Sequence, residues 1–280
     1  MTAISPVTRI KIKAYLEVFI EDLIKEYKDR KIPVLGNAAE YLNKRSYRGQ
    51  LKPFHAAIIP TEILRINEFE RGFSSSLGST FEECARLIAL EHHREVYRSF
   101  DVTGEVSTTA INEIEHQISL FEHAAENKGQ KPSFEKMVND VLSSREGGNL
   151  ENRVARADLF IHSKDGTFYF FEIKSPMPNK GQCLEVTQRL LRFHLLKGQP
   201  RPVVNAYYAM AYNPYGPNRE QYKWNFALNY LPFDQALVVG QEFWNIIGGP
   251  TAYKELLEIY QEVGREKSKY MLDALAFGFW

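Results

Sequence analysis

The stretch RADLFIHSKDGTFYFFEIKSP, residues 156–176, decides the fold. Two runs rich in aromatic and aliphatic residues, 157–162 and 167–174, flank a polar turn at 164–166 that contains Asp and Gly. Two such runs joined by a short Gly-containing turn are typical of a β-hairpin. The hairpin indicates that the sheet of this protein begins near residue 153.

The length of the turn decides where Asp158 points. Side chains alternate across a strand, so Glu172 and Lys174 share one face of the second run. A two-residue turn would place Asp158 on the opposite face from Glu172. A three-residue loop, 164–166, pairs Asp158 with Glu172, and Gly166 can adopt the left-handed conformation that this loop needs. We expect the three-residue loop or another odd register, and hence the convergence of Asp158, Glu172 and Lys174.

Regular elements on both sides of the hairpin extend it to an α/β fold. A helix is expected over 181–197 and a strand over 203–212, because the apolar spacing changes from helical to extended between them. Strands that alternate with helices indicate a central mixed β-sheet flanked by helices. The other helices expected are 79–100, 108–127, 133–145, 233–246 and 251–263, and the segments 74–78 and 213–218 are expected to be loops.

The first part of the chain, residues 1–75, is expected to be a helical region packed on a core of residues 76–280, the two forming one continuous domain. Apolar residues recur at helical spacing near its start. Pro53 and Pro60 are expected to interrupt regular structure after that first helix. The recurring apolar residues are Ile10, Tyr15, Phe19, Leu23 and Tyr27.

Composition excludes several classes of protein. The 280 residues are 44% hydrophobic and 25% charged, which is ordinary for a globular protein and unlike a disordered, collagenous or coiled-coil chain. No apolar run approaches the roughly 18–20 residues of a membrane span. Charges interrupt the apolar stretch at the N-terminus, so a signal peptide is not expected. Two cysteines, Cys84 and Cys183, suit a reducing cytoplasm.

The three polar residues of the hairpin suggest a chemistry. Two carboxylates, Asp158 and Glu172, offer the oxygen ligands that Mg²⁺ prefers, and Lys174 can orient an attacking water and offset charge on a phosphate. This combination suits hydrolysis of a phosphodiester. A buried salt bridge is the alternative, because an acidic residue two places before Lys occurs four times in the chain. Only the pair 172–174 ends an apolar strand that faces an Asp.

Asp158, thirteen residues, and then Glu172-Ile173-Lys174 resemble the PD-(D/E)XK nuclease motif, with Ala157 in place of the usual Pro. More specifically, the chain resembles the TdeIII family of type II restriction endonucleases. The resemblance covers most of the chain from about residue 50 to its end. The stretches that carry it are 51–60, 77–93, 156–196, 206–218 and 242–279.

The resemblance implies a restriction-endonuclease-like core and Mg²⁺-dependent cleavage of double-stranded DNA at a short quasi-palindromic site, which is GGNCC for the family's namesake. It implies that Asp158 and Glu172 hold the metal and that Lys174 activates or positions water. It also implies a cytoplasmic restriction-modification system with a cognate DNA methyltransferase. A quasi-palindromic target needs two equivalent active sites, so a two-fold homodimer is expected.

Two further positions match the family's accessory residues. The helix before the hairpin often contributes another acidic residue, and Glu82 is preferred here over Glu83. Their alternative role is in capping boxes with Ser79 and Thr80. The helix after the motif often carries a Gln or basic residue near the scissile phosphate, which makes Gln188 a candidate catalytic residue. Its alternative is an exposed helix position.

A local excess of positive charge between residues 180 and 223 suggests a DNA-binding surface. The protein as a whole is neutral, but this segment carries seven basic residues and two acidic ones. Phosphate contacts require such an excess, although acidic residues such as Glu113, Glu115, Glu122 and Glu126 could neutralise it. Arg201, Arg219 and Lys223 are further hypotheses for base contacts. The candidate DNA-binding residues are Lys180, Arg189, Arg192, Arg201, Arg219 and Lys223.

Two other classes of function compete with site-specific cleavage. One is a repair or structure-specific nuclease of the PD-(D/E)XK type, and the other is a DNA-binding protein without catalysis. The pattern of DNA fragments produced in the presence of Mg²⁺ separates these three classes.

Overall fold

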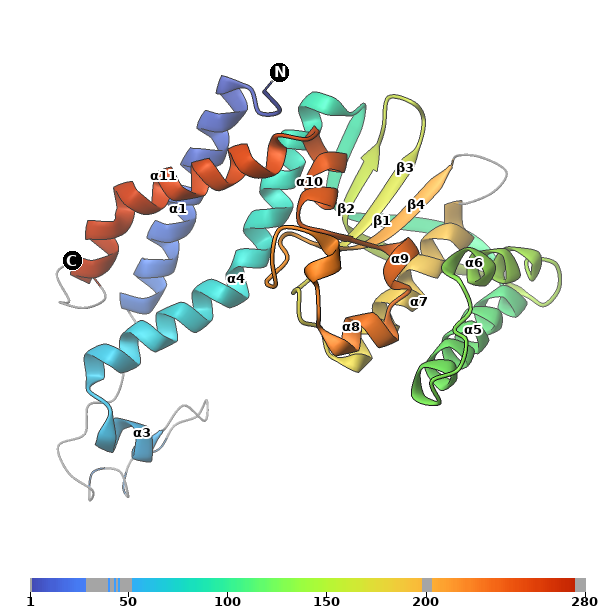
Figure 1. Ribbon diagram of the computed structural model, residues 1–280, viewed down its shortest axis with the longest axis horizontal. Helices are drawn as coiled ribbons and strands as arrows, with labels where there is room; N and C mark the ends of the chain where they lie inside the picture. Colours follow the sequence, from blue (N-terminus) through green and yellow to red (C-terminus); the bar gives the residue numbers. More distant parts are fainter. Residues whose placement is uncertain are drawn as a thin grey trace. The chain divides into compact units, whose positions relative to one another are not determined.

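The computed structural model describes residues 2–28, 40, 43, 45, 52–197 and 203–274, with the side chains of Ala56, Thr61 and Arg65 left aside (Figure 1). The chain forms two compact units. Unit 1 comprises Met1–Thr8 and Phe81–Leu256, and unit 2 comprises Arg9–Thr80 and Leu257–Trp280. The boundary near residue 80 lies close to the expected one at 75, but Leu257–Trp280 groups with the N-terminal helices and not with the core.

Unit 1 contains a mixed five-stranded sheet in the order β1-β2-β3-β4-β5. The strand β2 is antiparallel to both of its neighbours, β1 and β3, whereas β3, β4 and β5 run parallel. This architecture confirms the expected α/β class with a restriction-endonuclease-like core. The strands are β1 (Glu95–Ser107), β2 (Leu150–His162), β3 (Phe168–Ile173), β4 (Val204–Met210) and β5 (Leu237–Val239).

Helices cover both faces of the sheet. Successive residues of β3 point to opposite faces and contact a helix on each. Phe170 stacks on Phe193 of α7 with ring centroids 4.8 Å apart. Its neighbour Phe171 meets Phe243 of α10 at 5.4 Å on the other face. The helices of this unit are α5 (Thr108–Glu126), α6 (Phe134–Ser143), α7 (Lys180–Lys197), α8 (Asn225–Tyr230), α9 (Phe233–Ala236) and α10 (Gln241–Gly248), with a short 3-10 helix at Arg219–Gln221.

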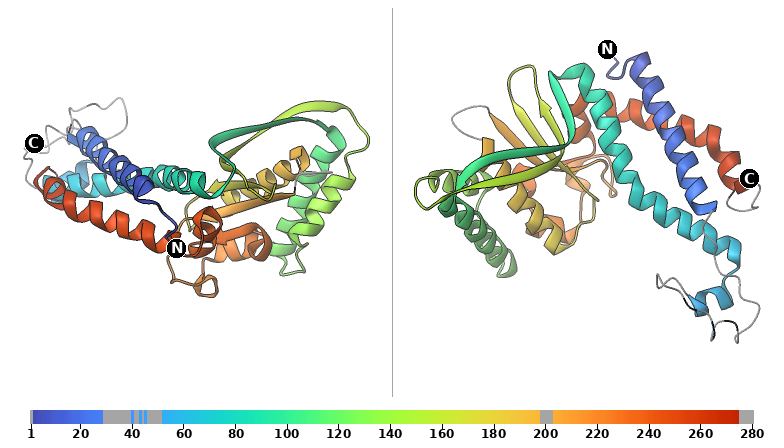
Figure 2. Two further views of the ribbon diagram at one scale, coloured as in Figure 1. Left: turned by 90° about the horizontal axis from the view of Figure 1, so that it is seen from above. Right: turned by 180° about the vertical axis from the view of Figure 1, so that it is seen from behind.

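The strands β1 and β2 continue together past the rest of the sheet. Each spans 13 residues, but β3 pairs only with the last part of β2, from Leu159 to His162. The earlier part of β2 pairs with β1 alone, as far as the pair Ser107 and Leu150. Figure 2 shows this two-stranded ribbon. The ribbon gives unit 1 an extended arm beside α5 and α7.

Unit 2 is helical. It is built from most of α1 (Pro6–Lys28), α3 (Pro53–Ile58), the first part of α4 (Thr61–His92) and most of α11 (Ala252–Leu272). Aromatic contacts hold α1 to α4, with Phe19 and Phe73 ring centroids 5.9 Å apart. Within the described ranges, no helix is long and apolar enough to cross a membrane.

The segment 74–78 was expected to be a loop, and this prediction is wrong, because α4 runs through it. Serine hydroxyls donate hydrogen bonds to carbonyls three residues earlier, so they have partners within the helix. Ser75 donates to the Gly72 carbonyl at 2.9 Å and Ser79 to the Ser76 carbonyl at 2.7 Å. Ser79 therefore lies inside the helix. The capping boxes expected for Ser79 and Thr80 do not form.

Two strands were missed in the sequence. The helix expected over 79–100 ends at His92, and β1 follows from Glu95. Charged residues in this strand resemble a polar helix face, but they lie on the exposed side of a ribbon. The helix expected over 233–246 is interrupted by β5, whose burial as a third parallel strand outweighs helical spacing. Gly240, with a φ of 56°, then starts α10.

Candidate active site

The turn between β2 and β3 is the three-residue loop that the sequence predicts. His162 pairs with Phe168, and the Ser163 amide donates to the Thr167 carbonyl at 2.9 Å. Gly166 has a φ of 89°, in the left-handed region, and its amide donates to Ser163 at 3.1 Å. The predicted register of Asp158 opposite Glu172 follows from this loop.

Asp158 lies where the strands separate. Regular pairing of β2 with β3 ends at Leu159 and Phe171, and Asp158 Oδ2 instead accepts the Ile173 amide at 2.8 Å. On the other side, the pairing of β1 with β2 skips Asp158 and Ser99, whose φ is 49°. At this break in both ladders, the Asp158 carboxylate takes the place of a main-chain carbonyl as the partner of the Ile173 amide.

Asp158, Glu172 and Lys174 converge as the sequence predicts. Lys174 Nζ lies 2.7 Å from Asp158 Oδ2 and 3.4 Å from Glu172 Oε2. Arg189 of α7 adds a second cation, with Nη1 2.7 Å from Glu172 Oε2. Glu172 is 0% exposed, and its Oε1 has no hydrogen-bond partner among the described residues. The cluster thus holds a buried carboxylate oxygen that its neighbours leave unsatisfied.

Burial and the charges within the cluster shift the pKa values of its members. Burial, reinforced by the negative charge of Asp158, raises the pKa of Glu172 to about 7 although Lys174 and Arg189 oppose the shift. Burial alone would lower the pKa of Lys174, but its hydrogen bonds and its attraction to Asp158 and Glu172 outweigh burial and raise it. Lys174 is therefore held in its protonated form, and the buried carboxyl group of Glu172 is harder to ionise than an ordinary glutamate.

Three ring donors fix the segment 175–179, which connects Lys174 to α7. They come from the end of β4 and the region after it, and spacing along the sequence gave no sign of them. Each donates to a backbone carbonyl, so the path of the chain out of the site is set by side chains from another part of the sheet. The bonds are Tyr208 to Ser175 at 2.9 Å, Tyr222 to Pro176 at 2.5 Å and Trp224 to Pro178 at 2.6 Å.

The accessory acidic candidates gather around a different cation. Glu82 lies 2.8 Å and Glu83 3.0 Å from the guanidinium of Arg98 on β1, and Glu83 also pairs with Arg86 at 2.5 Å. Arg98 stands opposite Leu159, one residue along β2 from Asp158. Within the described part of the chain, neither glutamate pairs with Lys174 or Arg189, so the structure does not bring Glu82 into the cluster.

The helix residue that reaches the cluster is Arg189. Gln188 is partly buried on α7 and has no polar partner in the described ranges, whereas its neighbour Arg189 contacts Glu172. Arg189 was expected to contact DNA, and its place beside Glu172 was missed. Periodicity along α7 could not distinguish the two positions, because the direction of β3 beneath the helix sets which one faces the site.

The remaining basic candidates divide by their contacts. Arg219 donates to both oxygens of Glu242, at 2.6 and 2.5 Å, and to the carbonyls of Phe233 and Leu237, which supports a structural role in place of the expected base contact. Lys180 is neutralised by Glu122 at 2.6 Å and Glu126 at 2.5 Å, the alternative that the sequence left open. Lys223 is exposed, Arg192 lines a cavity, and Arg201 lies outside the described residues.

Comparison with known proteins shows the family. Residues 8–264 match the family model described as "Type II restriction endonuclease, HinfI". The chain belongs to the HinfI family of type II restriction endonucleases. It is a DNA endonuclease, and the match decides against a DNA-binding protein without catalysis and against a repair nuclease. The family shown is that of HinfI, and the likeness to the TdeIII family remains a resemblance.

Relatives of this HinfI-family chain include three enzymes from Herpetosiphon aurantiacus. Type II restriction enzyme HgiEI is 48% identical over 266 residues, covering 95% of this chain and 96% of the relative. Type II restriction enzyme HgiBI is 47% identical with the same coverage. Type II restriction enzyme HgiCII is 48% identical, covering 95% of this chain and 97% of the relative. The likeness therefore extends over both compact units.

Proposed function

We propose that this restriction endonuclease hydrolyses double-stranded DNA at a short quasi-palindromic site through a Mg²⁺-dependent centre formed by Asp158, Glu172 and Lys174. The observation that carries the proposal is the buried Glu172 carboxylate, whose Oε1 has no partner within the described ranges although Asp158 lies beside it. A structural ion pair would satisfy both oxygens. A centre that receives a divalent cation would instead leave a carboxylate oxygen without a protein partner.

The residues present fit Mg²⁺. Asp158 and Glu172 supply carboxylate oxygens, and Mg²⁺ in proteins is usually held by one or two carboxylates, with water and a substrate phosphate completing its coordination. When bound, Mg²⁺ supplies positive charge that polarises the phosphate and favours attack by water. The raised pKa of Glu172 supports this fit, because a carboxylate that is costly to charge alone gains most from a cation.

Lys174 is proposed to act on the attacking water. In the free protein its ammonium group is held by Asp158 and Glu172, at 2.7 and 3.4 Å. From this position beside both carboxylates, Nζ would orient the attacking water and offset charge on the phosphate. Arg189 is proposed as a positioning residue, because it orients Glu172 from α7.

The target is proposed to be GGNCC, as the TdeIII-like stretches of the sequence imply. Purified protein with Mg²⁺ and plasmid DNA should give discrete fragments, and the ends of those fragments should fall within GGNCC. Discrete fragments with other ends would reject GGNCC and keep the enzyme class. A smear would indicate nonspecific hydrolysis, and intact plasmid under all divalent cations would reject the proposal.

A two-fold homodimer is proposed because a quasi-palindrome presents the same scissile bond on each strand, and one subunit offers one cluster of Asp158, Glu172 and Lys174. The enzyme is proposed to act in the cytoplasm, in a restriction-modification system whose cognate DNA methyltransferase protects host sites. That partnership is functional, with no physical contact required.

Arg189 gives a prediction on pH dependence. Only the carboxylate form of Glu172 can hold Mg²⁺, so cleavage should increase as the pH rises through about 7. Arg189 opposes the raised pKa of Glu172, and Arg189→Ala should therefore move the rising part of the pH–activity profile upward by about one unit. The activity of Arg189→Ala at pH 9 should stay close to that of the unmodified enzyme. Arg189→Lys keeps the positive charge and should return the profile most of the way to its unmodified position.

The matched control is Arg156→Ala. Arg156 is also paired with a carboxylate, lying 2.6 Å from Asp101, but both side chains are exposed on the ribbon. Its replacement should leave the profile unchanged. A uniform loss of activity at every pH in Arg189→Ala would show that Arg189 serves another purpose than the charge state of Glu172.

A further inference from the structure

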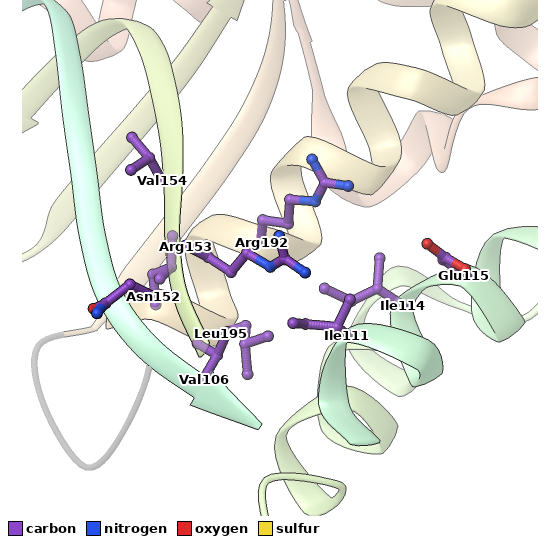
Figure 3. Close-up of a pocket in the computed structure, with 10 residues that line it drawn as sticks. Val106, Ile111, Ile114, Glu115, Asn152, Arg153, Val154, Arg192 and Leu195 are labelled. Atoms are coloured by element: carbon purple, nitrogen blue, oxygen red, sulfur yellow. The ribbon is translucent and has the colours of Figure 1, made fainter. Parts of the chain in front are cut away.

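We infer that a cleft containing Arg153 and Arg192 binds a phosphate of the DNA backbone next to the one that is cleaved, an inference that rests on the proposed function. The cleft is a cavity of about 410 Å³ between α5, α7 and the ribbon of β1 and β2. Figure 3 shows Arg153 extending from β2 and Arg192 from α7 into this space, with Glu115 of α5 on the far wall.

The positive charge in the cleft is poorly compensated. Arg192 has no ion pair within the described ranges, and burial together with the charges of Arg153 and Arg189 lowers its pKa. Among the residues that the structure describes, Arg153 pairs only with Glu151, and both side chains are about half exposed, at 52% and 42%. Such a surface pair contributes little to stability and exchanges readily for a phosphate.

One acidic residue opposes the two arginines. Glu115 lines the cleft and attracts Arg192, but the two do not form an ion pair in the described structure. Its carboxylate would repel a bound phosphate. Replacing Glu115 should therefore change the affinity for DNA in the opposite direction to replacing either arginine.

The place of the cleft relative to the active site suits a backbone phosphate. Arg192 follows Arg189 by three residues on α7, so the two side chains share one face of the helix, with an axial separation of about 4.5 Å. Phosphates of one DNA strand succeed each other every ~3.4 Å along the duplex axis. A strand that runs along α7 with its scissile phosphate beside Glu172 would thus bring a neighbouring phosphate to Arg192.

The walls of the cleft suit the sugar–phosphate chain. Its remaining lining is mainly aliphatic, including Ile111, Val154 and Leu196. Arginine can bind a phosphate through two donors. Among the described residues, the lining contains no aromatic ring for stacking a base, which favours the backbone over a nucleobase as occupant.

The test measures the dissociation constant of the full-length protein for duplex DNA with Ca²⁺ replacing Mg²⁺, over a series of salt concentrations. Arg192→Gln and Arg153→Gln should each weaken binding about tenfold and reduce the salt slope by about one, equally on target and random duplexes. Glu115→Gln should strengthen binding. Arg156→Gln, on the same strand but paired with Asp101 outside the cleft, should change nothing.

Three outcomes would overturn the inference: unchanged salt slopes in both arginine variants, weaker binding by Glu115→Gln, or losses confined to the target duplex, which would indicate a base contact. Thermal unfolding of each variant verifies that it is folded, and the opposite sign expected for Glu115→Gln does not depend on a loss of structure. Wild-type cleavage with Mg²⁺ tests the proposed function separately, so either idea can fail while the other stands.

Discussion

Replacement of Lys174 by Ala is expected to reduce the rate of DNA cleavage by roughly a thousandfold at saturating Mg²⁺, as removal of one group that stabilises the transition state commonly does. Lys174 is the cation held by both carboxylates, at 2.7 Å from Asp158 and 3.4 Å from Glu172. Loss of its ammonium group removes the positioning of water and the compensation of phosphate charge. DNA binding with Ca²⁺ should change little, because the rest of the DNA-binding surface is untouched.

The control for this variant is Lys164→Ala, in the exposed turn of the same hairpin. It removes an equal charge from the same supersecondary element and should cleave like the unmodified enzyme. Single-turnover rates separate chemistry from product release. Full cleavage by Lys174→Ala would disprove its role in the reaction, and loss of binding together with cleavage would assign it to DNA contact.

Glu172→Gln is expected to abolish cleavage and, in the absence of metal, to stabilise the protein at pH 8. Burial raises the pKa of Glu172 from 4.5 to about 7, so ionising this group opposes folding. The shift corresponds to a loss of about 3 kcal/mol, which is fully present above pH 7 and absent below about pH 4.5. As the pH rises through this window, the wild-type free energy of unfolding falls by that contribution, and the Gln variant avoids the fall.

Urea unfolding with a chelator at pH 5 and pH 8 measures this difference. The free energy of unfolding of Glu172→Gln should exceed that of the unmodified protein at pH 8 and approach it at pH 5. Added Mg²⁺ should stabilise the unmodified protein at pH 8 and leave Glu172→Gln unaffected, because the variant lacks the carboxylate that gains from the cation. A variant less stable than wild type at pH 8 would mean that the ion pairs with Lys174 and Arg189 outweigh the cost of burial.

The hairpin could be predicted from the sequence because its determinants are local. The turn 164–166 sets the register, and alternation along β3 then assigns Glu172 and Lys174 to one face. β1 and β5 could not be predicted, since their strand state comes from partners distant in the chain. β5 is a run of only three residues, Leu237–Val239, made a strand by β4.

The site was predictable to the same extent. Asp158, Glu172 and Lys174 follow from one hairpin, whereas Arg189 depends on how α7 crosses β3. Arg219 illustrates the opposite error: a basic residue beside a Pro- and Gly-rich loop suggests a DNA contact, but Glu242, 23 residues later, binds it. Charge along a sequence shows where cations are present and not which partners hold them.

The three rings that hold segment 175–179 connect the proposed role of Lys174 to β4 and to the stretch that follows it. Tyr222 and Trp224 lie in the stretch that follows the loop 213–218, yet they position the exit from Lys174. A chimaera that replaces Tyr222 or Trp224 while exchanging this stretch is therefore expected to alter turnover as well as any sequence preference. Variants selected for a new cleavage specificity should therefore keep Tyr222 and Trp224.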